Sequence, residues 1–218
     1  MDGFLNANGK LIVENMIDVI QQNKAYLSDI DGLIGDGDHG VNMNKGFTMC
    51  REQLKENASL SDALKTLSRV LLMEIGGSMG PLYGTFFSKM ARRCKAEEII
   101  DKNVFGDMLK DAVKGVSELG GATVGDKTLM DVLIPALEAY DNALSTGKNF
   151  GGSLSDMKEG AEAGWLSTKD LIAKIGRASR LGERSRGVLD AGATSCFLLL
   201  QSMVSSIEIL LQNTNDLG

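Results

Sequence analysis

The chain has 218 residues, of which 43% are hydrophobic, and carries a formal net charge of −6. This length and apolar content allow a sizeable buried core, and the acidic balance argues against nucleic acid as the main partner. Proline occurs only twice, whereas helix-forming residues are plentiful. We therefore expect an all-α protein that forms a single domain over residues 1–218.

The expected compartment is the cytoplasm. The first residues show no basic region followed by a signal-type apolar stretch, and we expect no apolar run of membrane-spanning length. Cys50, Cys94 and Cys196 are odd in number, widely spaced and match no metal-binding pattern. Reduced, mostly buried thiols are typical of cytosolic proteins, so we predict a cytoplasmic protein with no membrane partner.

Helical periodicity recurs along the chain, and strand-like alternation is nearly absent. We expect Ser61 to cap the third helix, Pro81 to lie in the first turn of the fourth, and Pro135 to kink the sixth. Small residues in the seventh, Ala161 and Gly164, should let a neighbouring helix approach closely. The expected helices cover about residues 8–28, 40–56, 61–75, 80 onward, 104–119, 128–145, 153–175 and 191–212.

Short loops make successive helices antiparallel, so alternate loops emerge at the same end. One set of alternate loops carries nearly all the glycine-rich and charged segments, at residues 31–39, 76–81, 120–128 and 176–190. We therefore predict an eight-helix, antiparallel, up-and-down barrel or bundle with one composite site at one end. Four helix N-termini would point into that site, where their free N–H groups favour anions.

The first of these loops sets Asp31, Asp36 and Asp38 within eight residues, followed directly by the only histidine, His39. Carboxylates this close repel each other unless a cation lies between them, and oxygen ligands suit Mg²⁺ or Ca²⁺. An EF-hand is excluded, because its twelfth position, counted from Asp36, would be Phe47 and not glutamate. We predict a Mg²⁺-nucleotide or Mg²⁺-phosphate site, with an ordinary turn as the alternative.

The other three loops each have two interpretations. The loop at 76–81 lets backbone approach a phosphate but lacks the Gly-Lys-Ser/Thr of a Walker A loop, so a tight turn is the alternative. The segment 126–128 either contacts the ligand or caps a helix. The four arginines of the last loop suit phosphate neutralisation, with a solvated surface loop as the alternative. We assign Trp165 to packing.

These segments resemble the nucleotide-binding L subunit of dihydroxyacetone kinase, over essentially the whole chain. The resemblance is carried, in order, by residues 34–47, 76–87, 125–128, 176–185 and 190–195. The family usually has serine one place later than Ser78, where this chain has Met79. The family also usually has proline where this chain has Ala191.

The resemblance implies an eight-helix barrel that holds ADP (or ATP) and two Mg²⁺ ions at one end. It implies that Asp31, Asp36 and Asp38 bind the metals, and that His39 and Arg177 take part in catalysis. The residues expected around the nucleotide are His39, Gly40, Val41, Asn42, Ser78, Met79, Gly120, Leu129, Arg177, Asp190, Ala191 and Gly192.

The family has two branches. In one, the L module is fused to a substrate module and exchanges ATP. In the other, L is a separate subunit whose bound ADP is rephosphorylated by a phosphohistidine protein of the sugar phosphotransferase system. L then passes the phosphoryl group to dihydroxyacetone on subunit K. A single L domain favours the second branch, and a homodimer is compatible with it. The alternatives are an ATP-exchanging kinase subunit for another small hydroxy compound and a nucleotide-gated regulatory module.

Overall fold

A computed structural model describes residues 3–215. Within this range the chain forms nine α-helices, two 3₁₀ segments (η1, Asn6–Asn8, and η2, Arg177–Ser185) and two short strands, which confirms the all-α prediction. The helices are α1 Lys10–Gln22, α2 Lys24–Ile34, α3 His39–Gln53, α4 Leu60–Glu74, α5 Met79–Cys94, α6 Lys102–Gly120, α7 Met130–Ser145, α8 Phe150–Ser167 and α9 Ala191–Asn215.

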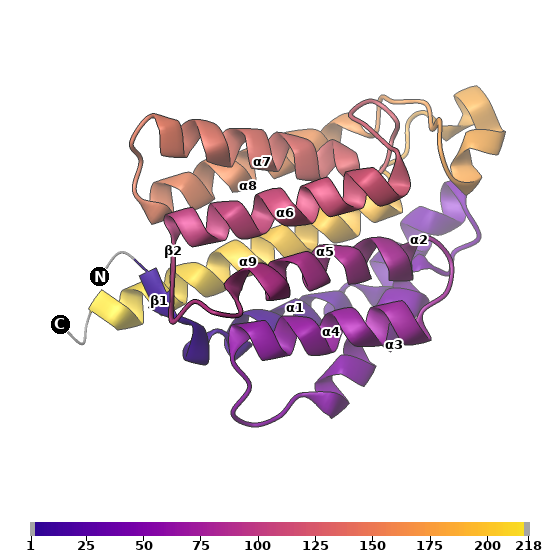
Figure 1. Ribbon diagram of the computed structural model, residues 1–218. Helices are drawn as coiled ribbons and strands as arrows, with labels where there is room; N and C mark the ends of the chain where they lie inside the picture. Colours follow the sequence, from indigo (N-terminus) through magenta and orange to yellow (C-terminus); the bar gives the residue numbers. More distant parts are fainter. Residues whose placement is uncertain (1–2, 216–218) are drawn as a thin grey trace.

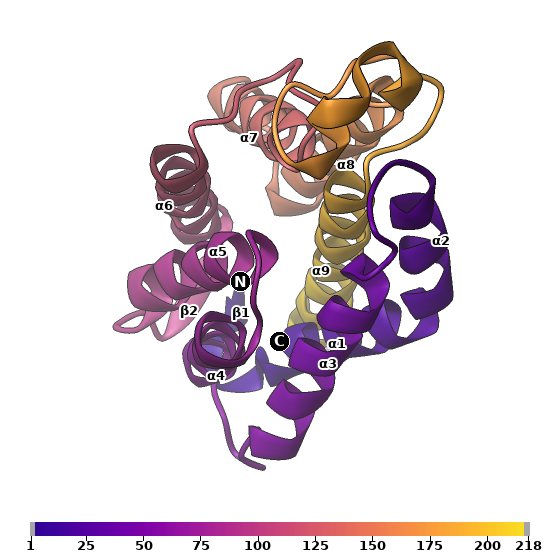
Figure 2. The same ribbon diagram turned by 90° about the vertical axis from the view of Figure 1, so that its right-hand side faces the viewer.

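The helices lie side by side along one long axis (Figure 1) and form a ring when viewed from the end (Figure 2). Their apolar faces meet in one core, to which α9 contributes a buried stripe that includes Leu199, Met203 and Ile207. Contrary to the sequence expectation, the stretch 191–213 of α9 is long and apolar enough to cross a membrane by length and composition. Its most apolar window is 61% buried, so packing within the barrel accounts for its composition.

Three predicted helix boundaries were wrong. The first expected helix is interrupted at Asn23, whose side chain donates to the carbonyl of Val19 and separates α1 from α2. Ser59, and not Ser61, caps α4: its hydroxyl accepts from the N–H of Asp62 at 3.1 Å. Ser61 is buried within the first turn.

The expected helix over 153–175 ends at Ser167. There the hydroxyl of Thr168 donates to the carbonyl of Trp165, and the carbonyl of Thr168 accepts from the side chain of Lys127. From Thr168 to Leu171 the backbone N–H groups bond carbonyls three residues back and not four, so the α-helical ladder stops here.

Two three-residue strands, which the sequence did not predict, join distant parts of the chain. Strands β1 (Gly3–Leu5) and β2 (Ile99–Asp101) pair in antiparallel register, with Gly3 opposite Asp101. They lie at the end of the barrel where both termini are found (Figure 1). Next to them, the side-chain amide of Asn6 donates to the carbonyls of Cys94 and Glu97, and its backbone N–H donates to the carbonyl of Glu98 at 2.9 Å, so hydrogen bonds between distant segments close this end.

Glycine lets α8 pack tightly against α7. Pro135 lies inside α7 and has no N–H to offer the carbonyl of Asp131. A Cβ at Gly164 would lie only 2.0 Å from that carbonyl oxygen, so no larger residue fits there without movement of the backbone. The close approach predicted at Gly164 is therefore confirmed, whereas the kink at Pro135 stays a prediction.

Candidate metal and anion site

A cleft of about 720 Å³ opens at the end of the barrel opposite the strands. Its walls come from the connections α2–α3, α4–α5, α6–α7 and α8–α9, so the four predicted loops do meet at one end. The sequence-predicted residues that line it are Asp31, Asp36, Asp38, His39, Asn42, Ser78, Met79, Gly120, Leu129, Arg177, Asp190, Ala191 and Gly192.

Two residues expected at the site lie outside the cleft lining. Gly40 is buried where α3 meets α2, and a Cβ there would lie 2.0 Å from the carbonyl oxygen of Lys24. Its glycine therefore serves helix packing. Val41 is 49% exposed and is also absent from the cleft lining. The resemblance implied that both surround the nucleotide, because of their position in the motif.

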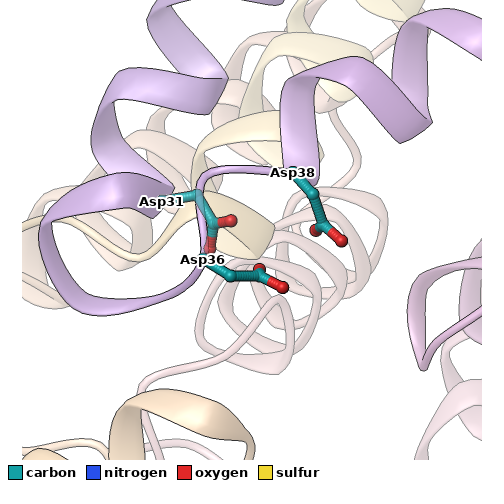
Figure 3. A group of neighbouring side chains, drawn as sticks. All are labelled: Asp31, Asp36 and Asp38. Carbon is teal, nitrogen blue, oxygen red and sulfur yellow. The ribbon is translucent and has the colours of Figure 1, made fainter.

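Three carboxylates project from the α2–α3 junction towards a shared region (Figure 3). Asp31 lies in α2, Asp36 in the loop and Asp38 at the N-cap of α3, and each offers an oxygen within 4.8 Å of the others. Asp38 makes no side-chain cap bond, so its oxygens are not used by the helix. Arg177 forms an ion pair with Asp36. This all-oxygen donor set fits a hard divalent cation such as Mg²⁺.

Helix capping differs between the two ends of the barrel. At the closed end, side chains of Ser59, Asp101 and Asn149 cap α4, α6 and α8 by accepting from first-turn N–H groups. At the cleft, the N-cap residues Asp38, Ser78 and Leu129 of α3, α5 and α7 make no side-chain cap bond. The first turn of α7 is capped by Thr128 instead, whose hydroxyl accepts from the N–H of Met130 at 3.1 Å, and in α3 the carboxylate of Asp31 accepts from the N–H of His39 at 3.3 Å. The N-termini of α3 and α5 thus lack a cap from their own N-cap residues, which suits their remaining N–H groups to bind an external anion.

His39 is held from behind by a hydrogen-bonded chain. Its Nε2 lies 2.9 Å from the hydroxyl of Ser195, which lies 2.7 Å from the hydroxyl of Tyr83. Burial lowers the pKa of His39 to about 4, and the nearby carboxylate of Asp31 opposes that shift only in part. His39 is therefore neutral near pH 7. Sequence reasoning missed Tyr83 and Ser195, because they are far from His39 along the chain.

Asp190 combines two roles at the start of α9. Its carboxylate caps the helix by accepting from the N–H of Ala193 at 2.8 Å, and the residue also lines the cleft. Burial raises the pKa of Asp190 to about 6, against the lowering effects of that hydrogen bond and of Lys127.

Of the four arginines in the last loop, only Arg177 lines the cleft. Arg186 instead donates to the carbonyl of Asp170 and pairs with Glu183. Trp165 stacks on Phe197 with ring centroids 4.6 Å apart and lies outside the cleft lining, as expected of a packing residue.

The fold and the site define a class: helical barrels with a carboxylate cluster and uncapped helix N-termini around one open cleft. The chain belongs to the DAK2 domain family, which matches residues 33–205.

Relatives of similar length match most of the chain. The chain is 35% identical over 201 residues to the ADP-binding subunit DhaL of PEP-dependent dihydroxyacetone kinase 2 from Listeria innocua, covering 90% of this chain and 93% of that protein. It is 37% identical over 188 residues to the ADP-binding subunit DhaL of the PEP-dependent dihydroxyacetone kinase of Escherichia coli, covering 85% and 91%. The names of these relatives describe subunits of a larger kinase assembly.

A solved structure confirms the fold. The native dihydroxyacetone kinase of C. freundii superimposes with a TM-score of 0.68 at 26% identity, over 92% of this chain and 34% of that chain. This chain therefore corresponds to about a third of that kinase. The same kinase has been solved in complex with AMP-PNP and Mg²⁺, and it superimposes with a TM-score of 0.67 at 24% identity.

Proposed function

We propose that this protein is the ADP-binding subunit of a phosphoenolpyruvate-dependent dihydroxyacetone kinase. It accepts a phosphoryl group from a phosphohistidine protein onto bound ADP and transfers it to dihydroxyacetone on a partner K subunit. The observation that carries the proposal is a juxtaposition: the N-termini of α3 and α5, which their N-cap residues leave uncapped, meet three carboxylates in one cleft. N–H groups suit phosphate oxygens, and carboxylates suit the metal that accompanies a nucleotide. The full-length relatives named as ADP-binding subunits support the same function.

Asp31, Asp36 and Asp38 would hold the metal, for which we propose two Mg²⁺ ions. When bound, Mg²⁺ neutralises charge on the phosphates and on the transferring phosphoryl group. We propose that Arg177 contacts the transferred group, which its ion pair with Asp36 in the same cleft supports. Neutral His39 can donate a hydrogen bond to a phosphate oxygen without adding charge.

The remaining lining suits a nucleotide in size and polarity. A cleft of about 720 Å³ lies within the range of about 300–1,000 Å³ that is usual for small-molecule sites. Met79, Leu82 and Leu129 provide apolar surface that a base can contact. Gly77 has a φ of +72°, and a Cβ there would meet nothing within 4 Å, so its backbone is open to a ligand.

Each transfer exchanges one bond of phosphorus for another. In the first, the P–N bond of the donor phosphohistidine breaks and a P–O bond forms to ADP. In the second, that P–O bond breaks, a new one forms to a hydroxyl of dihydroxyacetone, and the hydroxyl proton leaves to a base on the partner. His39 is the only histidine of the chain. Since it belongs to the cleft, the phosphocarrier histidine must come from another protein.

We propose that both partners approach over the mouth of the cleft. Helices that end at this mouth expose large apolar side chains: Leu33 of α2 is 67% exposed, Met73 of α4 is 76% exposed and Leu119 of α6 is 54% exposed. Met73→Glu should weaken turnover with K while ADP affinity stays unchanged. Loss of ADP affinity in this variant, or full turnover with K, would contradict that docking surface.

The decisive test compares phosphoryl donors. Purified protein, K subunit and dihydroxyacetone are supplied either with ATP or with phosphoenolpyruvate and the phosphotransferase proteins, and dihydroxyacetone phosphate is measured. We expect the protein to purify with ADP bound and to turn over well only in the second mixture. Rapid multiple turnover with ATP alone would favour the ATP-exchanging branch.

Because all three cysteines are free and buried, we also propose a cytoplasmic location.

A further inference from the structure

Lys127 has an unusual place in the cleft wall. It is 1% exposed, and among the described residues it is the only non-glycine with a positive φ, at +62°. A basic side chain at the start of a helix beside a candidate phosphate site would ordinarily be taken for a phosphate ligand. Its contacts exclude that role in this arrangement.

The ammonium group of Lys127 has no N–H left for a ligand. Lysine has three N–H donors. The Nζ atom of Lys127 donates to the carbonyls of Thr168, Leu171 and Val188, the bond to Leu171 measuring 3.3 Å. These carbonyls lie at the two ends of the segment 168–190, which connects α8 to α9.

The segment 168–190 closes on itself around this lysine. The N–H of Gly187 donates to the carbonyl of Lys169 at 2.7 Å, and the N–H of Asp190 donates to the hydroxyl of Thr168 at 3.2 Å. Between these ends the segment carries Arg177 to Asp36. The position of both Arg177 and Asp190 in the cleft therefore depends on where the two ends are held.

The loop that carries Lys127 is itself fixed. The carboxylate of Asp131 accepts from the N–H groups of Gly125 and Thr128, at 2.6 and 2.7 Å. Desolvation lowers the pKa of Lys127, and the carboxylates of Asp190 and Asp131 act in the opposite direction. A buried ammonium of this kind is held by its hydrogen bonds, so removing it would take the bonding partner from the carbonyls of Leu171 and Val188 and leave the carbonyl of Thr168 with only the N–H of Leu171, at 3.3 Å.

We infer that Lys127 is a positioning residue: it closes the segment 168–190 onto the cleft, holds Arg177 and Asp190 in place, and does not itself bind the nucleotide. Only the identity of the ligand in the cleft rests on the proposed function. The closure of the segment is a property of the protein alone and can be tested without nucleotide.

Two substitutions distinguish the effect of the Lys127 ammonium group from the effect of its backbone conformation. Lys127→Met keeps a long side chain and removes the N–H donors. Lys127→Gly also removes the donors, and glycine adopts the positive φ without steric cost. Lys174→Met is the matched control, because Lys174 joins the same two loops through an ion pair with Asp126 at 3.2 Å but is 62% exposed. Exposed ion pairs contribute little to stability.

Hydrogen exchange of nucleotide-free protein measures the closure. Both Lys127 variants should lose protection across 168–190 by about tenfold or more, while the helices stay protected. They should also be cleaved faster by trypsin at the loop arginines and release ADP faster in Mg²⁺. Added butylammonium, which matches the missing side chain, should restore protection in Lys127→Gly, and Lys174→Met should behave like wild type.

Folded Lys127 variants with unchanged protection would overturn the inference. Weaker ADP binding with unchanged protection from hydrogen exchange would instead indicate that Lys127 contacts the nucleotide directly. If wild-type protein binds no ADP, the proposed function fails, but the exchange result still decides the role of Lys127. Should neither variant fold, reductive methylation of wild-type protein decides: Lys127 should stay unmodified with or without Mg²⁺-ADP. Modification in nucleotide-free protein would refute the closure.

Discussion

The carboxylate cluster should destabilise the protein when no metal is bound, and this can be tested with Asp38→Asn. Oxygens of the three carboxylates lie within 4.8 Å of one another, and Arg177 offsets the charge of Asp36. Because the charge of Asp36 is offset, the main interaction that the substitution removes is the repulsion between Asp38 and Asp31. At this separation that repulsion is about 1 kcal/mol in water-like surroundings, which corresponds to a rise in Tm of about 2–4 °C for a domain of this size.

The same substitution should have the opposite effect when ligand is present. A nucleotide at about a hundred times its Kd stabilises the native state by about 2.7 kcal/mol. Wild-type protein should therefore gain about 5–10 °C in Mg²⁺-ADP over its Tm in EDTA. Asp38→Asn should lose most of this gain, because one metal ligand has lost its charge.

Thermal unfolding in EDTA, in Mg²⁺ and in Mg²⁺-ADP measures both effects. Asp29→Asn is the control, because Asp29 is exposed on α2, the helix that carries Asp31, and lies outside the cluster. A lower Tm of Asp38→Asn in EDTA, or a full gain in Mg²⁺-ADP, would refute the assignment of this cluster to metal.

Other consequences concern packing, pH and capping. Gly40→Ala should lower the free energy of unfolding, measured by urea denaturation, by about 1–3 kcal/mol or more, because its Cβ would lie 2.0 Å from a carbonyl oxygen of α2. Gly151→Ala is the control and should leave the free energy of unfolding unchanged, because its Cβ would meet only one atom, at 4.0 Å. The pKa of Asp190 is raised from 3.8 to about 6, so the native state binds more protons than the unfolded chain and stability should fall as pH rises through that window. Asp190→Asn should flatten this dependence by up to about 3 kcal/mol between pH 4 and pH 7.5, and equal slopes for both proteins would contradict it. Ser59→Ala should cost about 1 kcal/mol and Ser61→Ala less, since only the first caps α4; the reverse order would restore the sequence-based assignment.

Much of the fold could be predicted because the apolar periodicity is strong and the loops are short. The missed features depend on contacts between distant residues. Nothing in the local sequence around Asn23 requires a break, since neither proline nor glycine occurs there. Apolar spacing continues through Leu171 and Ile175, but α8 ends earlier because Lys127 binds the carbonyls of Thr168 and Leu171. Tertiary hydrogen bonds of this kind leave no periodic signal.

The candidate site was predicted where its residues are close in sequence. Asp31, Asp36 and Asp38 share one loop, and the alternation of loops brought the other three connections to the same end. The support behind His39 could not be predicted, because Tyr83 and Ser195 are 112 positions apart. Gly40 was assigned to the nucleotide by its place in the motif, and the structure adds that it packs against α2 outside the cleft lining, which the motif alone does not reveal.

The position of the chain ends restricts how this barrel can be joined to anything else. Helix α9 begins at the cleft and runs for 25 residues, about 37 Å, to the end where β1 also lies (Figure 1). A tag or a second module attached at either end would therefore start far from the mouth and leave it unobstructed. For the same reason, a fused module that must reach the mouth needs a connecting segment of at least about 11 extended residues. Tethering at the closed end thus suits surface-immobilised binding assays, in which the cleft must face solution.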